Sequence, residues 1–373
     1  MRGDILMIEM LKPPAETLYE AELRALQQED QGHRPPNWLL SPANVRDFII
    51  GRDKPAMLDG EKITITRKFY GNDVLIERAV VTLAGNRGLM LVGEPGTAKT
   101  MLSELLTAAI SGTSLNTIQG TAGTTEDMIK YSWNYAMLLD KGPSEAALVP
   151  SPLYNGMKKG ILTRFEEITR CPAEAQDSLI SILSDKVMSI PELDGGVLFA
   201  KPGFNVIATA NIRDKGVNEM SGALKRRFNF ETIRPIQNVK MEAKIIESQA
   251  RNLLLHSGID TEIQTDVVEL LATTFMELRT GMSREGYKLD TPQASMSTAE
   301  AVSVYVQSAM TSYYYEGKSI ALDRLVQNML GTIAKENDKD LSILKNYFSK
   351  IVKARSAEEE IWKNYYEERK WIG

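Results

Sequence analysis

Cysteine and histidine are almost absent from the 373-residue sequence: Cys171 is its one cysteine, and His33 and His256 are its only histidines. A single cysteine cannot form an internal disulfide, and three residues of these types leave almost no ligands for a Cys/His zinc site. Long hydrophobic runs are missing as well, since no apolar stretch approaches the roughly 18 to 20 residues that span a bilayer. Charged residues also interrupt positions 1–14, where a signal peptide needs an apolar core. We therefore expect a cytoplasmic protein without a zinc site or a membrane span.

An excess of positive charge is also lacking. The chain has 44 Lys and Arg against 49 Asp and Glu, a formal net charge of −5. A general nucleic-acid binder is usually basic, so nucleic acid is disfavoured as a partner, although a local basic groove is compatible with this balance. The hydrophobic content of 43% and the charged content of 25% are typical of globular proteins, and the length suits two or three domains.

Short apolar runs alternate with helical patterns between residues 89 and 233. Candidate strands lie at 89–92, around Ile118, and at 161–165, 204–208 and 230–233, with candidate helices near 100–111, 172–184 and 219–226. This alternation predicts an α/β fold with a parallel five-stranded sheet flanked by helices. Beyond Pro235 the pattern is helical only. We expect a helical leader and linker at 1–60, an α/β domain at 61–234, an all-helical domain at 235–335 and a helical tail at 336–373.

A loop between the first strand and the following helix carries the strongest chemical signal. It consists of Gly93, Glu94, Pro95, Gly96, Thr97, Ala98, Lys99 and Thr100. A phosphate-binding loop turns backbone N–H groups toward phosphate at a helix N-terminus, reaches the β/γ oxygens with a lysine and offers Mg²⁺ a hydroxyl. Lys99 and Thr100 supply the last two parts, while Ala98 stands where the usual pattern has glycine. The loop predicts binding of ATP and Mg²⁺ in the α/β domain.

Two acids, Glu166 and Glu167, follow the strand candidate at 161–165. Facing a phosphate-binding loop, one carboxylate suits the metal shell and the other suits orienting or deprotonating the attacking water. The alternative is a strand that ends in ordinary solvated acids. Glu166 is one methylene longer than the usual aspartate, and Arg164 occupies a strand expected to be buried, for which the sequence offers no physical account.

Two further polar segments follow. The strand at 204–208 continues to Asn211, whose amide could hold the water or the γ-phosphate, although asparagine at a strand end is more often a turn residue. Arg226 and Arg227 lie just before the last strand. They could be solvated side chains at a basic helix end. Alternatively, one of them could reach the γ-phosphate of the nucleotide bound to a neighbouring subunit.

Two segments could contact other molecules. Apolar runs on both sides of Asp194-Gly195-Gly196 predict a β-hairpin within 186–199. Its tip could be a working element or a plain surface turn. The tail at 358–371 could use its aromatic residues to dock a partner or to pack against the helical domain. These residues are Trp362, Tyr365, Tyr366 and Trp371.

In their order along the chain, these segments resemble the AAA+ ATPases and, within them, the MoxR family. The resemblance is carried by the loop at 93–100, Glu-Ile-Thr-Arg at 167–170, Ala-Thr-Ala-Asn at 208–211 and Lys-Arg-Arg-Phe at 225–228. Arg-Phe-Glu-Glu-Ile at 164–168 is similar to the YehL-like subgroup. The resemblance covers residues 70–233 well and the helical part to about 330 loosely.

The resemblance implies a P-loop AAA+ core followed by an all-helical lid, and it implies a role for each matching residue. Lys99 and Thr100 would contact phosphate and magnesium, Glu166 would be the metal-side Walker B acid, Glu167 the catalytic glutamate, Asn211 the sensor-1 residue and Arg227 the arginine finger, with Arg226 as its competitor. The lid departs from the family, because Ser297-Thr298-Ala299-Glu300 replaces the step that usually carries a sensor-2 arginine.

For function, the resemblance implies an ATPase that forms a homo-oligomeric ring, expected to be a hexamer, and remodels or matures a protein client. A client with a von Willebrand factor A domain is one such expectation, and the hairpin at 186–199 falls where the family carries its pre-sensor-1 hairpin. Two alternatives stay open: a nucleic-acid-directed AAA+ motor subunit, and an ATP-gated scaffold with little turnover.

Overall fold

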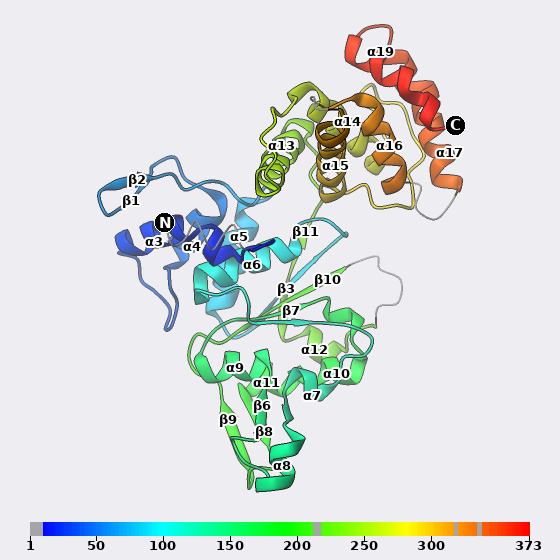
Figure 1. Ribbon diagram of the computed structural model, residues 1–373. Helices are drawn as coiled ribbons and strands as arrows, with labels where there is room; N and C mark the ends of the chain where they lie inside the picture. Colours follow the sequence, from blue (N-terminus) through cyan, green and yellow to red (C-terminus); the bar gives the residue numbers. More distant parts are fainter. Residues whose placement is uncertain (1–9, 212–217, 317–319, 334–337) are drawn as a thin grey trace. The chain divides into compact units, whose positions relative to one another are not determined.

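The computed structural model describes residues 10–211, 218–316, 320–333 and 338–373. The chain divides into two compact units (Figure 1). The first comprises Met1–Glu94 with Ala98–Arg234, and the second comprises Pro235–Gly373, with which Pro95–Thr97 are grouped. The buried hydrophobic residues of the second unit form one core, and those described in the first unit form two.

Five parallel strands form the central sheet of the first unit, in the order β11-β3-β10-β7-β4 (Figure 1). Their bounds are β3 Gly88–Gly93, β4 Thr117–Gln119, β7 Thr163–Glu166, β10 Val206–Asn211 and β11 Phe228–Ile233. The predicted parallel five-stranded sheet is therefore confirmed. The first strand in the sequence lies near the middle of the order, because parallel neighbours need crossover connections over the faces of the sheet.

Helices cover both faces of this sheet. Leu89 and Leu91 belong to one hydrophobic core and Met90 to the other, as the period of two along a strand requires. On the first face lie α2 Ala15–Leu18, α3 Glu20–Glu29, α4 Pro42–Ile50, α5 Asp73–Ala84 and α6 Lys99–Ser111. On the second face lie α7 Glu126–Ile129, α9 Pro152–Lys159, α10 Ala173–Asp177, α11 Leu179–Asp185 and α12 Gly222–Lys225. The described part of the predicted leader thus packs into the core, where Leu26 and Phe48 are fully buried.

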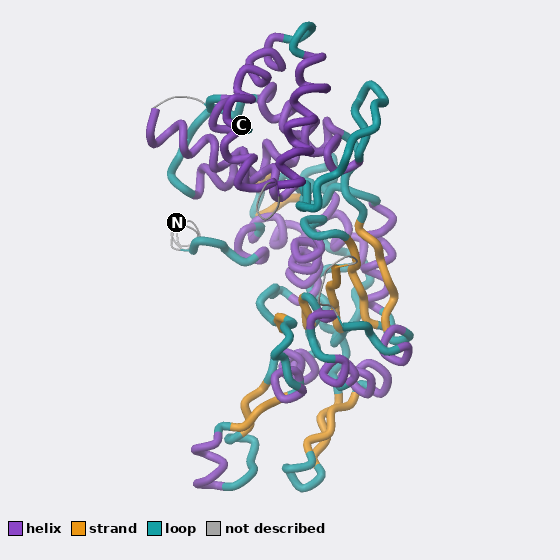
Figure 2. Tube along the Cα trace, turned by 90° about the vertical axis from the view of Figure 1, so that its right-hand side faces the viewer, coloured by secondary structure: helices purple, strands orange, loops and turns teal. Residues whose placement is uncertain are grey.

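Three short antiparallel hairpins complete the first unit: β1 Ala56–Leu58 with β2 Glu61–Ile63, β5 Tyr131–Trp133 with β6 Leu148–Pro150, and β8 Val187–Ile190 with β9 Gly196–Phe199. The hairpin predicted around Asp194 is confirmed. The hairpin of β5 and β6, which encloses α8 Tyr135–Lys141, was not predicted, because its three-residue strands are too short to show a period. The hydroxyl of Tyr131 donates to Glu192 at 2.8 Å, and both hairpins extend from the same end of the unit (Figures 1 and 2).

The second unit is built of helices: α13 Val239–His256, α14 Thr265–Thr280, α15 Thr298–Glu316, α16 Leu322–Ile333, α17 Asp338–Tyr347, α18 Lys353–Arg355 and α19 Glu360–Glu367. A π-helical turn, Phe348–Val352, follows α17, and a 3-10 turn, Glu368–Trp371, follows α19. Phe275 and Tyr305 share one core with Tyr347 and Tyr365 near the end of the chain. The boundary expected between 335 and 336 lies outside the described residues.

The aromatic tail decides between the two alternatives that the sequence left open. Trp362 and Tyr365 are 3% and 0% exposed and belong to the core of the second unit, so these two side chains pack against the helices and do not form a docking surface. Their rings pack against neighbouring aromatic rings, with a Trp362–Tyr365 centroid distance of 6.0 Å. Burial of the large apolar rings outweighs any benefit of displaying them.

No helix in the described ranges is both long enough and apolar enough to cross a membrane.

Candidate active site

Three adjacent strands end at the residues that the sequence singled out. Gly93, Glu166 and Asn211 are the last residues of β3, β7 and β10, and β10 lies between the other two strands. Because parallel strands share the direction of their carboxyl ends, these positions meet at one edge of the sheet. In the register of the sheet, Asn211 lies opposite Gly93. The structure therefore brings together the start of the loop, both acids and Asn211.

The loop runs from the end of β3 to the start of α6. The ammonium of Lys99 donates to the carbonyl oxygens of Gly93 at 3.2 Å and Glu94 at 2.8 Å. Ala98 has a φ of 65°, in the left-handed region that favours glycine, which is the residue that the usual pattern has at this position. Burial lowers the pKa of Lys99, while the neighbouring carboxylates, Glu167 first, oppose that shift.

Glu166 accepts hydrogen bonds on both carboxylate oxygens. Oε2 accepts from the hydroxyls of Thr100 at 3.0 Å and Thr209 at 2.7 Å. Oε1 accepts from the hydroxyl of Ser103 at 2.6 Å and from Nε and Nη2 of Arg164 at 3.1 and 2.9 Å. The sequence had no explanation for Arg164. The structure supplies one, since residues two apart on a strand share a face and Arg164 thus lies beside Glu166 under α6.

These contacts decide the charge of Glu166. Burial alone would raise the pKa of this carboxyl. The hydrogen bond from Ser103, the charge of Arg164 and the threonine hydroxyls outweigh burial, so the pKa lies below its ordinary value. Glu166 is therefore ionised at neutral pH even though its side chain is only 5% exposed.

Glu167 has a different environment. Its backbone adopts a φ of 55° and a ψ of 44°, a left-handed conformation that is uncommon for glutamate and concentrates at functional sites. Its N–H donates to the hydroxyl of Thr209 at 3.0 Å, which holds that conformation. The amide of Asn211 donates to both carboxylate oxygens at 3.0 Å, and the side chain is 25% exposed. One acid is thus enclosed and the next reaches solvent, although they are neighbours in the chain.

Thr209, Ser103 and Gly120 also shape the site, and the sequence analysis did not single them out. The N–H of Gly120 donates to the carbonyl of Glu166 at 2.7 Å, and a Cβ at Gly120 would lie 2.4 Å from the carbonyl oxygen of Glu167. The spacing of Ser103, three residues after Thr100 on one helix, could have indicated that both hydroxyls share a face. Thr209 and Gly120 have no such signal, because only strand pairing brings them to the acids.

Arg226 and Arg227 lie elsewhere. They precede β11, whose first residue, Phe228, pairs with Gly88 at the start of β3, so both arginines are near the opposite edge of the sheet from Gly93. Arg227 donates to the hydroxyl of Ser184 at 2.8 Å and to the carbonyl of Ala223 at 2.7 Å. Arg226 is exposed. The first unit therefore does not bring either arginine to its own loop.

The step at 297–300, where the sequence lacks the expected sensor-2 arginine, lies at the start of α15 in the second unit. Thr298 donates to Glu242 at 3.0 Å. Arg279 pairs with Glu242 at 2.7 Å and also donates to the carbonyl oxygens of Met296 at 2.6 Å and Ile236 at 2.9 Å. These contacts tie the beginnings of α13 and α15 together within the unit.

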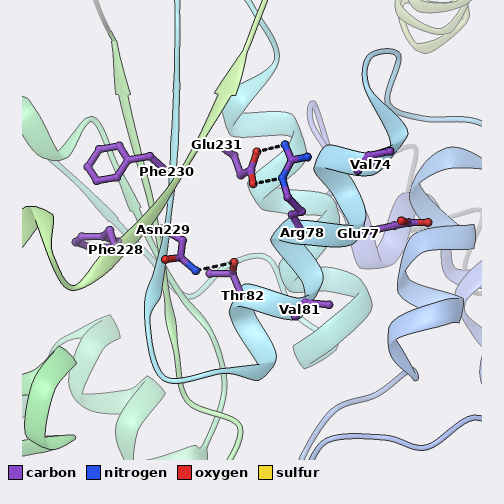
Figure 3. Close-up of a pocket in the computed structure, with 9 residues that line it drawn as sticks. All are labelled: Val74, Glu77, Arg78, Val81, Thr82, Phe228, Asn229, Phe230 and Glu231. Carbon is purple, nitrogen blue, oxygen red and sulfur yellow. Dashed lines mark hydrogen bonds and ion pairs between the residues drawn. The ribbon is translucent and has the colours of Figure 1, made fainter.

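A separate pocket lies between α5 and β11 (Figure 3). Arg78 and Glu231 form two hydrogen bonds of 2.7 Å there. The pocket is lined by Val74, Glu77, Arg78, Val81, Thr82, Phe228, Asn229, Phe230 and Glu231. None of these nine residues is a predicted site residue.

The oxygen atoms of Thr100 and Glu166 fit the needs of a magnesium ion. Within the described part of the chain, no group of three or more His, Cys, Asp or Glu side chains could hold a metal. Magnesium at phosphate sites needs no such group, since it keeps several waters and takes one or two protein ligands beside the phosphates. A hydroxyl and an ionised carboxylate 3.0 Å apart, from Thr100 and Glu166, meet that requirement.

Comparison with known proteins shows the family to which the chain is similar. A family described as AAA domain (dynein-related subfamily) matches residues 88–228, and one described as YehL-like AAA+ ATPase C-terminal domain matches residues 240–373. The protein YehL of Escherichia coli (strain K12), described as uncharacterized, is 49% identical over 360 residues, which is 96% of each chain. Chaperone MoxR1 of Mycobacterium tuberculosis is 30% identical over 169 residues, 45% of this chain and 41% of that protein.

The chain therefore belongs to the AAA+ ATPases and, within them, to the YehL-like group of the MoxR family. Solved structures show weaker likeness. The RuvB Holliday junction branch migration motor of Thermotoga maritima has a TM-score of 0.44 at 17% identity, over 74% of this chain and 76% of that one. NtrX of Brucella abortus in complex with ADP has a TM-score of 0.49 at 12% identity, over 82% and 65%.

Proposed function

We propose that this protein binds ATP with Mg²⁺ at the carboxyl edge of its sheet and hydrolyses it. The observation that carries the proposal is the contrast between two neighbouring acids beside the loop. Glu166 is enclosed and held by hydroxyls, as a metal-side acid requires, while Glu167 is partly exposed and held by the Asn211 amide. Separate environments for paired carboxylates are how such sites divide their roles.

Each residue has a task in this proposal. Lys99 moves from the loop carbonyls to the phosphate oxygens, for which it is a mobile positive charge. Glu167 accepts a proton from the attacking water or orients that water, and Asn211 holds the carboxylate in place for it. Thr100 and Glu166 hold the magnesium ion. When bound, that ion neutralises charge that develops on the phosphates.

We further propose that the site is completed by a second copy of the chain. Arg227, or Arg226 in its place, lies near the opposite edge of the sheet from the loop, so it can serve as a finger only for a neighbour. A ring, expected to be a hexamer, provides such a neighbour for every loop. Mixing Arg227→Ala subunits with Lys99→Ala subunits should restore part of the turnover that each variant lacks. If rings shown to be mixed recover no turnover, Arg227 acts within its own subunit or only stabilises the fold.

We propose that the energy of ATP hydrolysis is used to remodel or mature a protein client. A protein with a von Willebrand factor A domain is a candidate for this client. One relative bears the name Chaperone MoxR1, which supports a protein client. The hairpin of β8 and β9 lies between the acids and Asn211 in the chain, so its position can follow nucleotide state. Shortening it at 190–197 should leave basal turnover in place and abolish activation of the client.

Steady-state phosphate release from ATP by the full chain tests the proposal. The parent protein should release phosphate, and Lys99→Ala should not. DNA should leave the rate unchanged. Stimulation by DNA would favour a nucleic-acid-directed motor. ATP binding without release would favour an ATP-gated scaffold.

A further inference from the structure

Arg164 is a buried charge at the proposed active site. Its side chain is 6% exposed and forms an ion pair at 2.9 Å with Glu166, whose side chain is 5% exposed. A buried arginine is tolerated only when its charge and its donors are matched. Here Nη1 donates to the carbonyl of Ser114 at 2.7 Å, while Nε and Nη2 both donate to Glu166 Oε1. Nε also donates to the hydroxyl of Ser103 at 2.9 Å, and Nη2 lies 3.5 Å from a second carboxylate, that of Glu104. The closest carboxylate contacts of the guanidinium, at 2.9 and 3.1 Å, are nevertheless both to Oε1 of Glu166.

This contact divides the carboxylate of Glu166 into two halves. Oε1 is held by the guanidinium of Arg164 and the hydroxyl of Ser103. Oε2 is directed to the hydroxyls of Thr100 and Thr209. Only Oε2 therefore faces the hydroxyl that, in the proposed function, holds magnesium.

The length of Glu166 matters for this division. An aspartate at this position would withdraw its carboxylate by one carbon–carbon bond. It could then keep contact with Thr100 or with Arg164, but not with both groups in the present geometry. Arginine at 164 and the extra methylene at 166 thus compensate for one another, because the longer side chain can satisfy a buried cation and still reach the loop.

We propose that Arg164 is a positioning residue for ATP hydrolysis, matched to glutamate at 166: it holds Oε1 so that Oε2 faces Thr100. The inference rests on the proposed function. Arg164 does not touch the nucleotide in this scheme and acts through Glu166. A purely structural role for Arg164 would instead affect folding stability without any dependence on which acid stands at 166.

A double-mutant cycle on the full chain separates these roles. The variants are Glu166→Asp, Arg164→Met and the double variant. The measurements are the maximal rate of ATP turnover, the Mg²⁺ concentration at half-maximal rate and stability to denaturant. Methionine keeps much of the arginine stem length without the charge. Arg164→Lys keeps the charge, and it replaces Arg164→Met in the cycle if that variant does not fold.

With arginine at 164, Glu166→Asp should lower the maximal rate at least tenfold, since the shorter acid cannot serve both groups. With methionine at 164, the same change should lower it less than threefold. Arg164→Lys should retain more turnover and a Mg²⁺ midpoint closer to the parent value than Arg164→Met. The matched control is Arg78→Met. It removes an arginine that also donates two hydrogen bonds to one glutamate, Glu231, each 2.7 Å long (Figure 3), and it should change the rate less than twofold.

Additive effects would overturn the inference. Effects are additive if Glu166→Asp lowers the maximal turnover rate by the same factor, within twofold, with arginine and with methionine at 164. The inference would also be overturned if the variants lost only stability. In that case the Mg²⁺ midpoint and the turnover rate per folded molecule would equal those of the parent protein. A parent protein that releases no phosphate would reject the proposed function and this inference with it. An active parent with additive effects rejects only the inference.

Discussion

Each of the two units contains a buried arginine that pairs with glutamate, and the two clusters differ in their surroundings. Arg164 in the first unit lies at the carboxyl edge of the sheet, next to hydroxyls of the phosphate-binding loop and of β10. Arg355 in the second unit pairs with Glu277 and Glu285. The ring of Trp362 lies 4.5 Å from the Arg355 guanidinium.

The difference teaches that a buried charge does not by itself mark a functional site. The Arg355 cluster joins α14, α18 and the segment after α14, and the hydroxyl of Tyr347 donates to Glu277 at 2.7 Å. Of these partners Glu277 and Tyr347 are buried in the core, whereas Glu285 is 37% exposed. The Arg164 cluster, in contrast, shares Glu166 with a loop that ends in a helix N-terminus, where anions bind. We therefore expect substitutions in the first cluster to change turnover and substitutions in the second to change stability.

The largest effect is expected for Glu167→Gln. The amide keeps the size and polarity of the side chain but cannot accept a proton, so ATP binding should persist while turnover falls about 10²- to 10⁴-fold. Nucleotide binding by fluorescence and phosphate release would measure the two separately. Turnover at the parent rate would remove Glu167 from the proposed chemistry.

Arg355→Met should have the largest effect in the second unit. It leaves Glu277, 5% exposed, without its cation, and breaking a buried ion pair by removing one partner costs about 3 to 5 kcal/mol. Denaturation followed by tryptophan fluorescence would show the loss, since Trp362 lies against this arginine. A stability within about 1 kcal/mol of the parent would mean that the cluster is not what holds the last helices.

Gly120→Ala tests whether backbone shape at the first cluster matters as much as its charges. The new methyl group would lie 2.4 Å from the carbonyl oxygen of Glu167, so the backbone of the acids must move. Overpacking of this kind costs about 1 to 3 kcal/mol. Turnover should fall about tenfold, because catalysis is sensitive to small displacements of its groups. Gly222→Ala is a matched control, since a Cβ there meets no atom within 4 Å. Equal turnover in both variants would contradict the close approach.

The smallest effect concerns pH and the second cluster. Hydrogen bonding to Arg355 lowers the pKa of Glu285 from 4.5 to about 2. A carboxyl whose pKa is depressed by folding contributes stability above its unfolded pKa and loses it as pH falls through the folded value. The stability of the protein should therefore decline between about pH 4.5 and 2 by about 1 kcal/mol or less from this group, since Glu285 is 37% exposed and screened by solvent. Denaturation curves at several pH values should show a shallower decline for Glu285→Gln than for the parent, and identical slopes would assign the decline to other groups.

Much of this molecule could be predicted from local patterns. The five strands, the helix that starts at Lys99 and the hairpin around Asp194 each have a signal within a few residues, either a hydrophobic period or a turn sequence. The hairpin of β5 and β6 has strands of three residues and left no such signal. The sequence also left open whether Trp362 and Tyr365 dock a partner or pack against the helical domain, and the structure shows that they pack. The pattern of a helix does not say which neighbour covers its aromatic face.

The sequence by itself determined the fold class and the family and indicated the candidate loop and acids, because each of these signals lies in residues that are close together in the chain. Only the tertiary structure decided how the two acids differ. Thr209 comes from β10 and Gly120 directly follows β4, and the order of strands in the sheet places both beside β7. Ser103 comes from α6, which packs over the same strand. Arg164 was visible in the sequence as an anomaly. It became a partner of Glu166 once α6 covered that face and excluded the water that would otherwise have solvated both charges.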